Sequence, residues 1–469
     1  MRVYLAYLMA LGLAGYAWRD WFPAAAGLVL LMAGINHPDM PHSILGVPGL
    51  NLWNAVALVA LPAWLVGRRR ERLSWDLPPL AALGLAVYVI IICVGNARLV
   101  AQPGPVVLDA DSVGEYIVNP LKYLLPALMI YDGARTRRRF SLAVLVVLAV
   151  YVALALLVFK WMPLSEAGSG GELTSRGLRR LAQETGFHKN SLAVMLAGAC
   201  WAVLAARCLV RSRLVSLSLA CLAGLVTLAM ALTGGRGGYL AWVAVGLAMC
   251  LVRWRALLVI GPLAVAGLVT VAPGVAQRAL EGISARGEQS ETGEIDQEAL
   301  GAGRLAVWPY MLAKVQESPL VGYGRLGYVR SGLHAFLVAE VDASFPHPHN
   351  AYLEWLLDNG WLGMLPMLLL YGGVLLTSVV LFRDSAHPMF VSAGGMAFAL
   401  VFAHVVGSAT GRSWYPNEDT ATMWASVGLM LRVWVERGRG RAAAARERAS
   451  GVRQLPATPV AVPVPAARG

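Results

Sequence analysis

Long apolar runs, separated by short polar and strongly basic stretches, dominate the hydrophobic pattern of this chain. An α-helix needs about 20 such residues to cross the hydrocarbon of a bilayer. The pattern therefore predicts an all-α, polytopic membrane bundle of about twelve transmembrane helices. Beyond residue 67, the predicted spans are 77–95, 113–131, 140–161, 188–206, 214–233, 237–252, 256–273, 361–382, 389–410 and 416–434.

The N-terminal region leaves two topologies open. It contains three shorter apolar runs, near 3–18, 22–35 and 50–66. Two spans here place the N-terminus inside the cell and give the total of twelve, whereas three spans place it outside. No cleavable signal peptide is evident, because no small-residue cleavage site precedes a soluble domain.

Composition supports a membrane protein. Hydrophobic residues make up 58% of the chain and charged residues only 14%, against about a quarter charged in soluble domains. This excludes a disordered chain, a disulfide framework and most cytosolic classes. The net charge of +12 comes from 35 Arg and 4 Lys and is typical of cytoplasmic loops, so it does not indicate nucleic acid. The five cysteines lack metal-ligand spacing, and we interpret them as packing residues.

Basic clusters orient the predicted spans. They occur near 68–72, 135–139, 207–213 and 253–255 and in the tail, and the positive-inside rule places all of them in the cytoplasm. The longest polar segment then faces the periplasm. Within it, Leu305, Trp308, Leu312 and Val315 have helical spacing. The predicted organisation is 1–273, N-terminal transmembrane helices; 274–348, a long periplasmic loop with surface helices; 349–435, C-terminal transmembrane helices; and 436–469, a basic, disordered cytoplasmic tail.

Several arginines fall on the opposite side from these clusters. Arg236 lies in a glycine-rich turn, Thr233-Gly234-Gly235-Arg236-Gly237-Gly238, and Arg304 opens the loop helix. A charge near hydrocarbon is costly and generally faces a cavity or a partner. Guanidinium groups bind phosphate oxygens in a bidentate manner, so the pattern indicates an anionic ligand. Further basic residues predicted on this face are Arg176, Arg179, Arg180, Lys189, Arg325 and Arg330.

A candidate general base lies where the long loop meets the next span. Asn350 has the character of a helix N-cap, and Asn359-Gly360 that of a helix stop. His349 is therefore predicted at a helix N-terminus, where the helix dipole disfavours the imidazolium form. A neutral imidazole is what a general base requires. His347, its neighbour, is interpreted as structural.

Three ordered motifs make residues 185–410 resemble the bacterial O-antigen ligases, O-antigen polymerases and related oligosaccharyltransferases. The 233–237 turn resembles the family's Thr-x-Ser-Arg-Gly turn, with Gly235 in place of Ser. Residues 303–308 and 317–324 resemble its Arg-plus-Gly-x-Gly stretch, and 349–353 matches its His-Asn-x-x-Leu motif. Residues 186–190 also resemble an upstream Asn-containing segment.

The resemblance implies a GT-C-like O-antigen ligase of the bacterial inner membrane, with its active site facing the periplasm. Such an enzyme transfers a glycan from undecaprenyl pyrophosphate to a hydroxyl of the lipid A–core oligosaccharide. By correspondence with the family, Arg236 and Arg304 stabilise the leaving pyrophosphate and His349 deprotonates the acceptor in one inverting displacement. The substrate-binding residues expected beside them are Arg176, Arg179, Arg180, Lys189, Asn190, Arg325 and Asn350.

We expect no cofactor and no metal. Asp109 and Asp111 have the Asp-x-Asp spacing of a Mg or Mn site, but Arg236 and Arg304 already supply the counter-charge. Glu115, Lys122 and Glu418 are further outward or span-edge charges that the sequence leaves unassigned.

Other functions remain open at this stage. An O-antigen polymerase uses the same donor with a second lipid-linked glycan as acceptor, and a protein O-oligosaccharyltransferase uses a Ser or Thr hydroxyl. A transporter or flippase for a lipid-linked anion is a different class. Transporters place their charges near the bilayer midplane, whereas the candidate residues here collect on one membrane face.

Overall fold

The computed structural model describes residues 2–41, 43–44, 46–162, 175–259, 261, 266–267, 270, 304–341, 347–411 and 413–449. Within the helices, some side chains are not described, among them those of Asp111, Arg176 and Arg304.

The described chain is almost entirely helical, apart from a short antiparallel hairpin of β1 (Ser43–Ile44) and β2 (Val47–Pro48). The helices of the first half are α1 (Arg2–Ala17), α2 (Trp21–Leu30), η1 (Leu31–Ala33), α3 (Leu52–Arg70), α4 (Pro79–Ala101), α5 (Ala110–Val113), the π-helical η2 (Gly114–Val118), α6 (Asn119–Lys122), α7 (Leu125–Gly133), α8 (Arg137–Trp161), α10 (Ser175–Thr185) and α11 (Lys189–Ala206). Those of the second half are η3 (Arg207–Leu209), α12 (Arg213–Leu232), α13 (Arg236–Val252), α17 (Arg304–Glu317), α18 (Gly327–Arg330), α19 (Leu333–Glu340), α20 (Ala351–Arg383), α21 (Pro388–Gly407), η4 (Ser408–Thr410) and α22 (Glu418–Ala449).

Among the residues that the structure describes, six helical segments are long and apolar enough to cross a membrane. They are α4, α8, α12 and α20, together with α11 extended through η3 and α21 extended through η4. Shorter apolar helices include α13 and two within the first 33 residues. The predicted helical membrane protein is therefore supported, whereas the predicted count of twelve spans is not confirmed.

Two predicted spans differ from the structure. The run 113–131 is divided among η2, α6 and α7, and Pro120 and Pro126 lie in the first turns of the last two. Proline has no amide hydrogen to continue a helical ladder, which favours such breaks. The predicted span at 256–273 lies mostly outside the described residues.

Helix α22 corrects the prediction of a disordered tail beginning at residue 436. It continues through Ala449, because an alanine run favours helix and because Arg437 and Arg441 both pair with Asp384, at 2.6 and 3.0 Å. Its apolar part packs inside the bundle, which accommodates polar residues such as Thr422 and Ser426. The tail beyond Ala449 lies outside the described residues.

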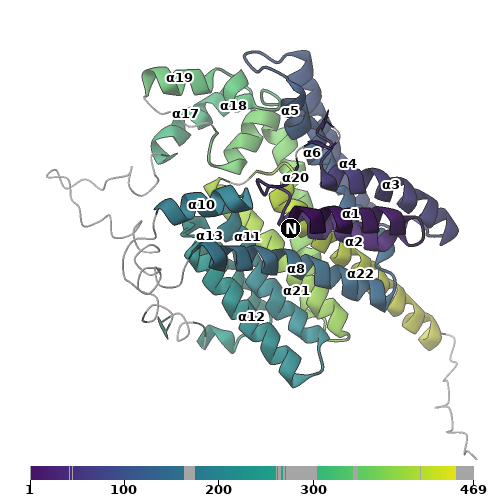
Figure 1. Cartoon of the computed structure of the whole chain (residues 1–469). Helices are drawn as coiled ribbons and strands as arrows, with labels where there is room; N and C mark the ends of the chain where they lie inside the picture. The colour runs from purple at the N-terminus through teal and green to yellow at the C-terminus, as the bar shows by residue number, and fades with distance from the viewer. Residues whose placement is uncertain are drawn as a thin grey trace, which may run out of the picture.

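The helices form a bundle with a separate lobe at one end. Helices α17, α18 and α19 make this lobe, and α20 connects it to the bundle (Figure 1). Below the lobe, rings from α4, α20, α22 and the 411–417 loop pack together. Tyr88 stacks on Trp355 with ring centroids 5.7 Å apart, and Tyr371 meets Trp414 edge-on at 4.6 Å. This aromatic cluster fixes the 411–417 loop against α20.

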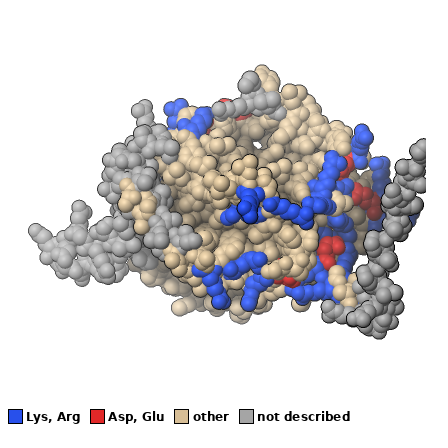
Figure 2. All heavy atoms as spheres, turned by 90° about the horizontal axis from the view of Figure 1, so that it is seen from below, with Lys and Arg blue, Asp and Glu red and all other residues tan. Residues whose placement is uncertain are grey.

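The basic clusters share the face opposite the lobe, where Lys and Arg side chains gather (Figure 2). Asp76, between α3 and α4, is the centre of their network. Its carboxylate pairs with Arg432 at 2.6 Å, Arg135 at 3.2 Å and Arg439 at 2.5 Å. Burial alone would raise the pKa of Asp76, but hydrogen bonds from Arg432 and Tyr131 and the nearby guanidinium charges lower it overall.

Replacing this carboxylate is expected to loosen the basic face. Arg432 is fully buried, so Asp76→Asn leaves its charge without its main partner and should lower the free energy of unfolding by about 3 kcal/mol. Because the pKa is lowered on folding, the stabilisation is present above about pH 4 and is lost as the pH falls further. Thermal unfolding in a neutral detergent measures both effects.

Glu340→Gln is the matched control, because Glu340 is exposed and far along the chain from this network. If the two variants unfold at the same temperature across the pH range, the proposed role of Asp76 is wrong.

Candidate functional site

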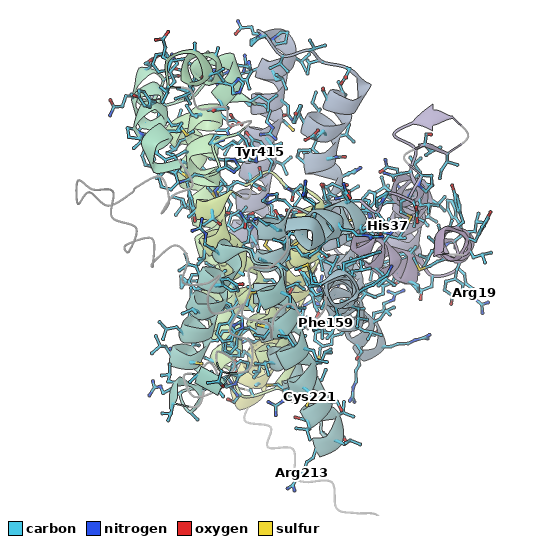
Figure 3. All side chains as sticks on the ribbon, turned by 60° about the vertical axis from the view of Figure 1, so that its left-hand side comes forward. Arg19, His37, Phe159, Arg213, Cys221 and Tyr415 are labelled. Carbon is cyan, nitrogen blue, oxygen red and sulfur yellow. The ribbon has the colours of Figure 1, made fainter. Side chains whose placement is uncertain are left out.

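The ends of four elements that carry the sequence motifs meet on the face opposite the basic clusters. Arg253, just beyond α13, donates to the carbonyl of Phe382 at 3.2 Å, so α13 and α20 end on the basic face. At its other end, α13 begins at Arg236 beside Thr410, which follows α21. Figure 3 shows the same polarity: Arg213 marks one end of the bundle, and Tyr415 lies toward the lobe.

The glycine turn between α12 and α13 fits closely against α11. A Cβ built on Gly235 would lie 2.6 Å from the Cβ of Ala193, 3.0 Å from the carbonyl oxygen of Lys189 and 3.2 Å from Oδ1 of Asn190. No ordinary contact is this short, so the Ser usual in the family motif has no room here. Glycine in place of the family's Ser at position 235 therefore allows α11 to approach the turn closely. This close approach places Lys189 and Asn190 beside the turn.

The turn before α13 is held by hydrogen bonds within it. Thr233 is buried, and its hydroxyl accepts from the amide of Gly235 at 3.4 Å. Tyr239 donates across the turn to Ala231 at 2.7 Å. Among the residues that the structure describes, no side chain caps α13, and the amide of Gly238 donates to the carbonyl of Gly235 at 2.8 Å. The positive end of the helix dipole favours an anion at this end of α13.

Arg236 is the first residue of α13, and its side chain is exposed. Among the residues that the structure describes, none pairs with its guanidinium group. A free guanidinium at an uncapped helix N-terminus combines two sources of positive potential. The arrangement suits a phosphate group better than either feature alone.

The segment after α21 joins this turn to His349. A Cβ on Gly237 would overlap Thr410, and a Cβ on Gly411 would lie 3.5 Å from Nδ1 of His349. Gly411 adopts a φ of +117°, in the region that favours glycine. Thr410 thus packs against the turn that carries Arg236, and Gly411 lies beside the imidazole of His349.

His349 occupies the predicted position at a helix N-terminus. It directly precedes Asn350, whose Oδ1 accepts from the amides of Tyr352 at 3.0 Å and Leu353 at 3.3 Å. Asn350 is therefore confirmed as the N-cap of α20, with its side-chain amide oxygen as the acceptor. His349 has a φ of +52°, which is unusual outside glycine. Its half-buried ring meets that of His347 edge-on at 4.0 Å.

The Gly-x-Gly stretch of the long loop pairs with α20 where that helix is interrupted. Gly360 adopts φ 60° and ψ −165°, so the helical ladder is interrupted near the predicted stop and then resumes. Loop backbone fills the gap: the amide of Tyr323 donates to Leu357 at 2.7 Å, and that of Trp361 donates to Pro319 at 2.8 Å. The close approach excludes side chains at Gly322 and Gly324, whose φ values are +58° and +82°.

Arg325 lies directly after this docked segment and is buried. Its Nη1 pairs with Glu354 at 3.2 Å and Asp358 at 3.3 Å, both on α20. Its guanidinium also stacks on the ring of Tyr415 at 3.6 Å. Burial alone would lower the pKa of Arg325, but these partners raise it overall. The predicted role in substrate binding stays a prediction, since the observed contacts tie the loop to α20.

Two further arginines, Arg98 on α4 and Arg330 on α18, link the loop to the end of α4. Arg98 donates to the carbonyls of Val321 at 2.7 Å and Gly322 at 2.9 Å. Arg330 donates to Gln102 at 3.0 Å and to the carbonyl of Tyr323. The sequence pattern did not single out Arg98.

The predicted upstream basic cluster divides between two helices. Arg179 and Arg180 are exposed on α10, where they border an open cavity of about 560 Å³ with Gln183 and Glu184. Arg180 also lies over the ring of Trp161 at 4.5 Å. The side chain of Arg176, on the same helix, lies outside the described residues. Lys189 and Asn190, at the start of α11, lie beside the glycine turn.

Arg304 begins α17 as predicted, although its side chain is not described. The helix packs against the rest of the protein through Val307, Met311 and Val315, of which Val315 belongs to the predicted apolar positions. Of the other predicted positions, Trp308 is half-buried and Leu312 is 49% exposed. Leu305 lies outside the described side chains.

The possible metal ligands do not form a described cluster. Asp109 is exposed. Hydrogen bonding from the hydroxyl of Ser112 and from its amide, the latter at 2.8 Å, lowers the pKa of the Asp109 carboxyl. The side chain of Asp111 is not described. No group of three metal-ligating side chains occurs within the described part of the chain. Metal independence therefore stays an expectation.

The unassigned charges lie along a separate polar seam. Lys122 donates to Oδ1 of Asn54 at 3.2 Å and lies over the ring of Tyr123 at 4.8 Å. Glu418, at the start of α22, accepts from Asn36 at 3.3 Å. These contacts are consistent with the structural ion-pairing and hydrogen-bonding roles expected for such residues by default.

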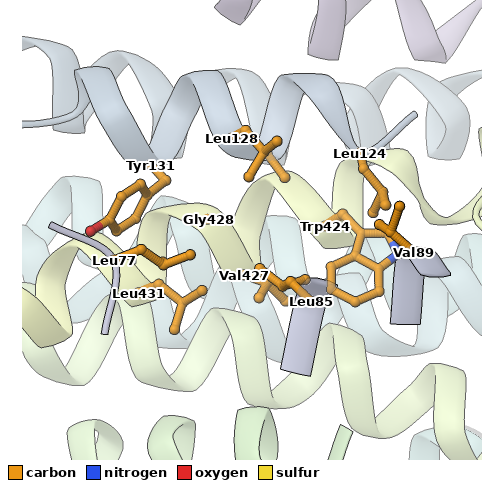
Figure 4. A pocket seen from close by; sticks show the side chains of 11 residues that line it. Leu77, Leu85, Val89, Leu124, Leu128, Tyr131, Trp424, Val427, Gly428 and Leu431 are labelled. Carbon is orange, nitrogen blue, oxygen red and sulfur yellow. The ribbon is translucent and has the colours of Figure 1, made fainter. Parts of the chain in front are cut away.

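An apolar cavity of about 60 Å³ lies between α4, α7 and α22, away from Arg236 (Figure 4). Leu85, Leu128 and Leu431 are among its walls, and Tyr131 lies at one end. A cavity of about 150 Å³ is needed for benzene, so this space is too small for a prenyl chain.

Thr410, Gly411 and Tyr415 are the main site elements that the sequence analysis missed. The signal available was a second Thr-Gly-Arg run, Thr410-Gly411-Arg412, at an outward turn like that of Arg236. The structure around Arg412 itself is not described.

The fold and this junction define a helical membrane protein with a basic and imidazole-bearing site at its helix ends. Residues 217–368 match the family model described as O-antigen ligase. This match, over about a third of the chain, supports a protein of the O-antigen ligase family. The matched region contains Arg236, Arg304 and His349. No curated protein has a significant match to the chain.

The fit at Gly235 gives a direct test of the site's packing. Gly235→Ser restores the family's usual residue but forces its Cβ against Ala193, so we expect a loss of about 1–3 kcal/mol in unfolding free energy. Ala193→Gly in the same chain should recover part of this loss. Thermal unfolding of the single and double variants measures the coupling.

Gly224→Ser is the control, because Gly224 lies on α12 with open space at its Cβ position. Equal effects at Gly224 and Gly235, or no recovery with Ala193→Gly, would show that the turn does not require the close contact.

Proposed function

We propose that this chain is an O-antigen ligase that transfers a glycan from undecaprenyl pyrophosphate to a hydroxyl of the lipid A–core oligosaccharide. The family match supports glycan transfer of the ligase or polymerase type in general. The observation that supports the proposal is the packing of the Thr410–Gly411 segment, which contacts Gly237, the residue after Arg236, and also lies against His349.

The proposed mechanism is a single displacement. His349 accepts the proton of the acceptor hydroxyl, whose oxygen bonds to the anomeric carbon. The bond from that carbon to the pyrophosphate oxygen breaks, and the electron pair leaves with undecaprenyl pyrophosphate. Arg236, the first amides of α13 and Arg304 stabilise the growing negative charge. The anomeric configuration inverts, and neither metal nor cofactor takes part.

The proposed orientation places the site in the periplasm, with the protein in the bacterial inner membrane. It is supported by the gathering of the basic clusters on one face, which the positive-inside rule assigns to the cytoplasm. Arg236 and His349 lie at helix ends on the opposite face. This position favours transfer over transport, since a transporter holds its charges near the bilayer midplane.

An assay with purified protein and lipid-linked donor tests the proposed function. The acceptor is either lipid A–core or a second donor molecule, and both reactions run with and without excess EDTA. We expect product only with lipid A–core, an inverted linkage and full activity in EDTA. A lengthened lipid-linked glycan would instead identify a polymerase, and a retained configuration would exclude the single displacement.

Substitution of His349 tests the general base. His349→Ala should reduce transfer by about 100-fold or more, while binding of the lipid-linked donor persists because Arg236 and the α13 N-terminus are unchanged. The measurements are the transfer rate and donor affinity in reconstituted membranes.

His334→Gln, in the lobe helix α19, controls for a general effect of losing a histidine. Undiminished transfer by His349→Ala would eliminate His349 as the base, and loss of donor binding would assign it to substrate recognition.

A further inference from the structure

The basic face contains a cavity unrelated to the proposed site. It measures about 500 Å³ and lies where the turn between α11 and α12 meets the segment after α13. Arg207, Arg253 and Arg255 contribute to its lining, with Ser216, Trp254 and Leu204. None of the residues that line it is acidic. Three guanidinium groups therefore share one concave space without a carboxylate on its walls.

The hydrogen bonds of these arginines leave much of their donor capacity unused. Arg207 donates from Nε to Ser216 at 3.1 Å. Arg253 donates from Nη1 to Phe382 at 3.2 Å and Ser385 at 3.1 Å. No described residue pairs with Arg255, whose side chain is exposed. Because like charges held close together repel, an anion in the cavity would be stabilised by all three.

The surroundings of the cavity fit a lipid. Trp254 is an aromatic residue of the kind enriched at membrane interfaces, and it packs edge-on against Phe382 at 5.1 Å. The outer face of α13 carries an apolar stripe that ends just before Arg253. Its members are Leu240, Val243, Leu247 and Leu251, each more than half exposed. Acyl chains lying along this stripe would leave a headgroup at the level of the cavity.

We propose that this cavity binds the phosphate of an anionic phospholipid in the leaflet that contacts the basic face. Basic pockets between membrane helices recognise such headgroups through charge and bidentate hydrogen bonds. Arg255 and Arg207 contact the phosphate, Arg253 both holds α20 and adds charge, and Trp254 marks the interface. The lipid would join α11, α12 and α13 at one end without entering the reaction at the other.

Titration of the full chain in a neutral detergent tests the assignment. Phosphatidylglycerol, phosphatidylcholine and inorganic phosphate are added separately, and the midpoint of thermal unfolding reports binding to the folded state. We expect phosphatidylglycerol to raise the midpoint at concentrations where the other two do not. Arg255→Gln should weaken this binding by about fivefold, whereas Arg255→Lys should retain most of it.

Arg138→Gln is the matched control, because Arg138 is exposed on the same basic face but does not line the cavity. Equal weakening by Arg138→Gln and Arg255→Gln would show a diffuse charge effect and overturn the proposal. Binding of inorganic phosphate alone, with the same dependence on Arg255, would assign the cavity to the free anion. Equal binding of phosphatidylcholine would exclude recognition of charge.

Discussion

The ion pair between Arg325 and the two carboxylates of α20 is the contact on which the arrangement of the site depends. A buried guanidinium needs close counter-charge, because an unpaired charge in a protein interior is strongly destabilising. Arg325 finds it in Glu354 and Asp358, which lie one and two turns beyond the N-cap of the helix that follows His349. Tyr415 covers the same guanidinium and donates to Asp358 at 2.9 Å. The loop lobe, α20 and the segment beside Gly411 are thereby fixed to one another.

Backbone pairing at the break in α20 adds to this contact. The segment 319–324 supplies hydrogen bonds where Gly360 interrupts the helix, and Arg98 holds the same segment from α4. The family-like Gly-x-Gly pattern therefore has a structural explanation in this chain: side chains at Gly322 and Gly324 would collide with neighbouring backbone or side-chain atoms. These contacts hold the loop lobe against α20, the helix that begins just after the candidate residue His349.

Much of the fold follows from periodicity, and the site follows only in part. The apolar runs gave α4, α8, α11, α12 and α21 nearly complete, because long uninterrupted hydrophobic helices have a strong signal. The Asn350 cap and the helix beginning at Arg304 were predictable from local chemistry. The burial of Arg325 was not, since its partners lie about thirty residues away and depend on tertiary packing. The role of Gly411 was hidden for the same reason, and α22 was helical beyond the predicted end because Asp384 anchors its arginines.

The broken helix has a consequence for how large molecules reach the site. If residues 319–324 moved away, α20 would lose the backbone partners at its interruption, and unpaired amide and carbonyl groups would remain inside the protein. These backbone partners therefore oppose an outward swing of the lobe at residues 319–324. A lipid-linked glycan of the proposed kind would have to reach His349 by a route that leaves this pairing intact.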